Sequence, residues 1–247
     1  PDGEKGMPEQ ALGRRGLLAS VAFVALGATA EARTIQGARP WSPGTADPPA
    51  AVRPGPWVFF TPEEGAAVEA LVERLIPADA LGAGAREAGC AVFIDRQLAG
   101  FFGTAERLYM RPPFAAGTPQ QGLQSPLTPA QHYRAALRAL DGHVRAAFAG
   151  RRMHELAAEQ RDGLLAALEK GQLRLEGADG RFFFELLLQN TMEGFFADPI
   201  HGGNRDMVGW KLVGFPGTRY DYRDHIAKHN QRYPLPPVGI GGRPDWG

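Results

Sequence analysis

The sequence predicts a mainly α-helical protein, with a compact multi-helix domain, long Gly/Pro-rich loops and an extended C-terminal tail. Three observations lead to this prediction. Apolar residues recur at the i, i+3, i+4 spacing of a helix in several segments. Two segments open with Thr-Pro and carry Glu or Gln three residues after the Thr, which is the pattern of a capped helix start. No segment shows the apolar/polar alternation of a half-buried strand.

The first helix is expected directly after Thr61. This residue can cap the helix, Pro62 suits its first position, and Glu64 can complete a capping box. Pro77 should end the helix, because proline lacks a backbone N–H. The apolar face in between consists of Val68, Leu71, Val72, Leu75 and Ile76.

A second helix is predicted over Gly89–Phe102, with Asp95, Arg96 and Gln97 in solvent. The lone cysteine, Cys90, excludes an internal disulfide, and we expect it to be a small buried hydrophobe. Residues 103–127 form a long Pro/Gly/Gln loop, and loops of this length tend to be functional.

Three further long helices are expected. Thr128-Pro129 starts an amphipathic helix that ends at Gly150, and residues 156–169 form the next. The segment Arg181–Phe196 is apolar on every side, so it should be central to the core or covered by another chain. A turn at His201-Gly202-Gly203-Asn204 then leads into a short helix that contains Trp210.

The N-terminus has the pattern of a twin-arginine export signal. Arg14-Arg15 precedes an uncharged, weakly apolar stretch, and Ala28-Thr29-Ala30 fits a small-x-small cleavage site. The stretch of about 15 residues is too short to cross a bilayer, so no transmembrane helix is expected. The predicted organisation is a signal region (1–30), a Pro/Gly-rich linker (31–56), a helical domain (57–219) and a Pro-rich tail (220–247) that clasps a partner.

No pattern points to chemistry carried by this chain. Lys plus Arg and Asp plus Glu both number 27, so the balance of charge does not indicate a nucleic-acid partner. The sequence contains no G-x-G-x-x-G turn, no Walker loop and no C-x-x-C-H haem motif. One alternative is a stand-alone periplasmic metal enzyme that uses His201, His225 and His229, and another is a small-molecule-binding protein.

The sequence resembles the gluconate 2-dehydrogenase subunit 3 family. The blocks that carry the likeness are Phe59-Phe60-Thr61-Pro62-Glu63-Glu64, Leu75-Ile76-Pro77-Ala78-Asp79, Gly84–Gly89, Phe93–Leu98, Asp198–Asp206, Gly209-Trp210-Lys211 and Gly214-Phe215-Pro216-Gly217.

The resemblance implies the non-catalytic small subunit of a membrane-associated heterotrimer that oxidises a sugar or sugar acid. FAD would lie in a large catalytic subunit and haem c in a multihaem cytochrome c subunit, with no catalytic, cofactor or metal residue in this chain. The small subunit would supply the export signal and assist maturation of the large one. The residues expected to contact the partner are Asn204, Arg205, Trp210, Lys211, Tyr233, Pro236 and Pro237.

Overall fold

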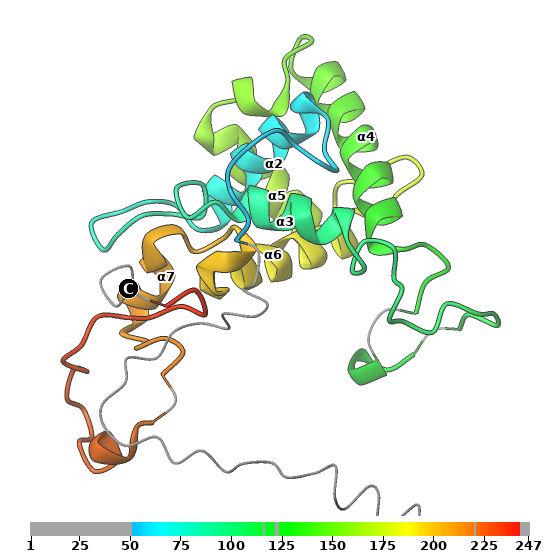
Figure 1. The fold of residues 1–247 in the computed structure, drawn as a ribbon. Coiled ribbons are helices and arrows are strands. Elements are labelled where there is room, and N and C mark those ends of the chain that lie inside the picture. Colours follow the sequence, from blue (N-terminus) through cyan, green and yellow to red (C-terminus); the bar gives the residue numbers. More distant parts are fainter. Residues whose placement is uncertain (1–50, 116, 122–123, 220, 243–247) are drawn as a thin grey trace, which may run out of the picture. The chain divides into compact units, whose positions relative to one another are not determined.

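The structure is a computed structural model that describes residues 51–115, 117–121, 124–219 and 221–242. The predicted signal region, with Arg14, Arg15, Ala28 and Ala30, lies outside the described residues, as do residues 31–50 of the predicted linker. The described residues form six α-helices, with isolated bridges but no strand, which confirms the mainly α prediction (Figure 1). The helices are α2 (Pro62–Leu75), α3 (Cys90–Ala99), α4 (Pro129–Ala147), α5 (Ala158–Glu169), α6 (Gly180–Phe196) and α7 (Val208–Val213).

The helix starts at α2 and α4 follow the predicted capping chemistry. At α2 the Thr61 hydroxyl accepts from the Glu64 N–H, and the Glu64 carboxylate accepts from the Thr61 N–H. Thr128 and Gln131 make the same reciprocal pair at α4. Local sequence therefore determines where these two helices begin.

Several predicted helix boundaries differ from the structure, and the amphipathic helix expected to end at Gly150 ends at Ala147. The second helix is shorter than Gly89–Phe102: it ends at Ala99, because the N–H groups of Gly100 and Gly103 both turn back to the Gln97 carbonyl. The helix predicted from residue 156 begins at Ala158, since a 3₁₀ turn over Met153–Glu155 precedes it. Cys90 is fully buried, as expected, and burial raises the pKa of its thiol to about 12.

Helix α6 is the centre of the core, as its all-round apolar sequence predicts. It packs against α2, α3, α4 and α5 and meets α7 beyond its C-terminal end (Figure 1). Phe183, Leu187 and Phe195 are at most 1% exposed, while Met192 on its outer side is 50% exposed. The helix also buries a polar link, in which the Tyr133 hydroxyl donates to the side-chain oxygen of Asn190 at 3.0 Å.

The prediction that Asp95 lies in solvent is wrong. Its side chain is fully buried, and its carboxylate accepts N–H bonds of 2.9 Å from Val58, Phe59 and Phe60 and pairs with the guanidinium of Arg96. The chain ahead of α2 has no helix partner for these three donors, and the buried N–H of Phe60 in particular needs an acceptor. Asp95 supplies it and fixes this segment against α3.

We predict that Asp95→Ala lowers the free energy of unfolding by about 3 kcal/mol, because one buried and two partly buried N–H groups and one guanidinium lose their acceptor. Chemical denaturation followed by circular dichroism measures the loss. The control is Asp141→Asn, which removes only a surface i, i+4 pair with Arg145 and should cost less than about 0.5 kcal/mol. Equal losses for the two variants would show that Asp95 does not hold the segment.

Candidate functional site

The C-terminal end of α6 is closed by side chains from the turn that follows it. The Trp210 indole N–H donates to the Phe196 carbonyl, and the Asn204 side-chain amide donates to the Ala197 carbonyl, both at 2.8 Å. The last carbonyls of a helix have no partner within the helix, so a buried helix end needs such donors. These two bonds join the turn to the central helix.

Asn204 also determines the shape of the turn itself. It is fully buried in the left-handed conformation (φ 45°), and its side-chain oxygen accepts the Gly209 N–H at 2.8 Å. Two glycines bring the turn into contact with the α6 backbone. A Cβ atom added at Gly203 would lie 2.2 Å from the Gly194 carbonyl oxygen, and one added at Gly209 would lie 2.1 Å from the Phe195 carbonyl oxygen. No side chain fits at either position.

The first four predicted contact residues therefore differ in how accessible they are. Asn204 and Trp210, 0% and 4% exposed, use their polar groups within this chain. Arg205 is half-buried, and its backbone N–H donates to the Ala88 carbonyl at 3.1 Å. Lys211 alone is exposed. The four residues lie close together in the sequence. In the fold, Asn204 and Trp210 are buried and hold the turn, whereas Lys211 is an exposed cation.

The chain after Gly217 returns to the helical body at Val238. The two residues form a parallel bridge, the Thr218 N–H donates to the Val238 carbonyl at 2.7 Å, and Val238 is 4% exposed. Beyond it, the Ile240 N–H donates to the Asp198 carboxylate at 2.6 Å. Both ends of the intervening Pro-rich segment are therefore fixed on this chain, whereas the sequence predicts a tail held mainly by a partner.

Tyr233 is the centre of an aromatic cluster within this segment. Its ring lies 4.6 Å from the His225 ring and 6.0 Å from the Tyr222 ring, and the Arg219 guanidinium lies 5.2 Å from its centroid. The Tyr222 hydroxyl donates to the Gly217 carbonyl at 2.6 Å, and Arg219 donates to the Pro236 carbonyl at 2.6 Å. These contacts hold the proline run in place.

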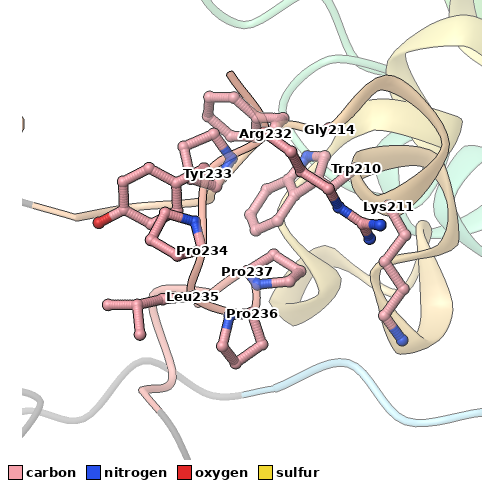
Figure 2. A pocket seen from close by; sticks show the side chains of 11 residues that line it. Trp210, Lys211, Gly214, Arg232, Tyr233, Pro234, Leu235, Pro236 and Pro237 are labelled. Carbon is pink, nitrogen blue, oxygen red and sulfur yellow. The ribbon is translucent and has the colours of Figure 1, made fainter. Parts of the chain in front are cut away.

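An open groove of about 600 Å³ lies between α7 and the proline run (Figure 2). It brings together Trp210 and Lys211 from one wall with Tyr233, Pro236 and Pro237 from the other, which are five of the seven predicted contact residues. The full lining is Trp210, Lys211, Gly214, Phe215, Pro216, Arg232, Tyr233, Pro234, Leu235, Pro236 and Pro237. Sequence reasoning missed Phe215 and Arg232 as lining residues, because only closure of the segment brings them to the groove.

The histidines of the metal-enzyme alternative do not share a site. His225 lies in a 3₁₀ turn that spans only Arg223–His225, so His229 is not one helical turn beyond it on the same helix. His201 is exposed, next to the turn around Asn204 that closes the end of α6 (the α6-capping turn). Within the described ranges, no three His, Cys, Asp or Glu side chains are grouped closely enough to hold a metal ion.

The helical domain matches a known protein family. The family described as Gluconate 2-dehydrogenase subunit 3 matches residues 62–217. The chain belongs to this family. The matched region runs from the start of α2 through the α6-capping turn and Trp210, and it stops at Gly217, where the Pro-rich segment leaves the body. One wall of the groove therefore lies within the subunit 3 match, while the proline run lies beyond it.

No curated protein and no solved structure matches the chain. The part of the chain that the structure describes holds no helix with the length and apolar character needed to cross a membrane. Two features of the chain bear on its function: the family match over residues 62–217 and the groove between α7 and the proline run.

We predict that Gly209→Ala lowers the free energy of unfolding by about 2–3 kcal/mol, because the new methyl group overlaps the Phe195 carbonyl and displaces the capping turn. The matched control is Gly142→Ala in α4, where a Cβ meets nothing within 4 Å. That variant should gain about 0.5–1 kcal/mol, since alanine favours a helix interior. Denaturant unfolding measures both, and a neutral Gly209→Ala would contradict the close packing.

Proposed function

We propose that this chain is the non-catalytic small subunit of a periplasmic, membrane-associated, flavin-dependent dehydrogenase that oxidises a sugar or sugar acid. Membership of the gluconate 2-dehydrogenase subunit 3 family carries the proposal, and the groove supports it by gathering residues that suit protein contact. In this proposal FAD lies in the large catalytic subunit and haem c in a multihaem cytochrome c subunit. The present chain holds neither cofactor.

The surface around the groove is suited to binding the catalytic subunit. Phe215 is 45% exposed, Leu235 is 48% exposed, and Ile226 in the same Pro-rich segment is 70% exposed. Large apolar side chains in water cost free energy that a protein interface recovers, at roughly 25 cal/mol per Å² buried. Aromatic residues and arginine are also the residues that most often dominate the energy of binding between proteins.

The second part of the proposal is shared export. The twin-arginine route carries folded proteins, and a large subunit that binds FAD in the cytoplasm is a cargo of that kind. The first described residues are attached to the folded body, because the Val52 N–H donates to the Ile200 carbonyl at 2.8 Å and Asp95 binds residues 58–60. A partner bound to this body would then be connected through it to the signal region and exported with it.

We predict that changing Arg14-Arg15 to Lys-Lys abolishes export of the large subunit. The two chains are co-expressed, and dehydrogenase activity is measured with an artificial electron acceptor in periplasmic and cytoplasmic fractions. Activity should move from the periplasm to the cytoplasm, because the large subunit is no longer exported by the signal on this chain.

The matched control is Arg151-Arg152 changed to Lys-Lys, a second adjacent arginine pair that lies in the folded domain between α4 and α5. It should leave periplasmic activity unchanged. Undiminished periplasmic activity in the Arg14-Arg15 variant would exclude shared export by this signal.

A further inference from the structure

We propose that the groove between α7 and the proline run binds a segment of the catalytic subunit that carries a carboxylate beside an apolar side chain. This inference rests on the proposed function, because it takes the partner from it. It adds the chemistry of the segment that is recognised. Three properties of the groove support it: the aromatic and proline rings in its walls, its two exposed cations and the fixed position of the proline run.

The groove has both polar and apolar surface, and the apolar part comes from rings. The Trp210 indole N–H is already used by the Phe196 carbonyl, so the small part of this ring that reaches the groove is carbon. Phe215 packs edge-on against this ring, with the centroids 5.1 Å apart. On the opposite wall, Pro234, Pro236 and Pro237 have no backbone N–H to donate. An apolar side chain can pack against these rings, beside the polar part of the groove.

The charged side chains that line the groove are both positive. Lys211 and Arg232 lie on the same side of the opening (Figure 2), and both side chains are exposed. Among the residues that the structure describes, neither side chain has an anionic partner, and the lining contains no Asp or Glu. A carboxylate placed between the two cations would pair with groups that are otherwise only hydrated.

The wall formed by the proline run is held in place by this chain. The run bends at Pro234 and Leu235, and its position is fixed by the Arg219 bond to the Pro236 carbonyl and by the bridge at Val238. Because this wall is ordered before binding, a ligand that lies along it loses only its own freedom. A volume of about 600 Å³ accommodates a few residues, and the exposed side chains of Phe215 and Leu235 can extend the contact at its mouth.

The test is the double variant Lys211→Glu/Arg232→Glu, titrated against the purified, FAD-loaded large subunit by calorimetry at two salt concentrations. We expect the dissociation constant to rise roughly tenfold or more, and the salt dependence of binding to weaken or reverse, because two attractive charges become repulsive. The conservative variant Lys211→Arg/Arg232→Lys should retain most of the affinity, since both positive charges remain.

The matched control is Lys170→Glu/Arg174→Glu, two exposed cations that do not line the groove. It makes the same change in net charge and should leave the affinity nearly unchanged. Thermal unfolding of each variant checks that the fold is kept. Equal losses of affinity in the two double variants, or no loss in either, would overturn the proposed recognition.

Replacing Leu235 with a photo-crosslinking residue identifies the segment that binds. We expect crosslinks to a stretch of the large subunit that contains Asp or Glu. Crosslinks to a stretch without an acidic residue, or none to the large subunit, would refute the inference. If the unmodified chain does not bind the large subunit, the proposed function fails as well, whereas binding that ignores residues 211, 232 and 235 overturns only the inference.

Discussion

The interaction on which the rest of the molecule depends is the closure of the C-terminal end of α6. The last carbonyl groups of a helix have no partner within the helix, and each one that is left buried and unsatisfied costs about 1–3 kcal/mol. Asn204 and Trp210 satisfy two of them. The same two residues fix the turn that leads into α7. The stability of the core and the position of the groove therefore both depend on them.

The second constraint is that both ends of the described chain are held by carboxylates, one on α3 and one just after the C-terminal end of α6. Asp95 on α3 binds the backbone ahead of α2, and Asp198, just after α6, accepts the N–H groups of Ile200 and Ile240. Two carboxylates thus attach segments that have little secondary structure of their own. The Pro-rich segment is held in this way as one wall of the groove.

The helices could be predicted from sequence because their signals are local. Thr61 and Thr128 cap the helices that follow them, and the apolar sequence of Arg181–Phe196 predicts the central position of α6. The burial of Asp95 could not be predicted, since its partners are backbone groups 35 to 37 residues away. Closure of the chain between Gly217 and Val238 is equally non-local, so the sequence predicts candidate contact residues but not the groove that five of them line.

The central claim is that this chain binds a catalytic partner through the groove and the Pro-rich segment. Hydrogen–deuterium exchange, measured on the purified chain alone and after addition of the FAD-loaded large subunit, tests it most directly. The claim predicts slower exchange over residues 211–215 and at the backbone amides of 221–235, with little change in the buried interior of α6. Protection confined to other surfaces, such as the outer face of α4, with none around the groove, would contradict it.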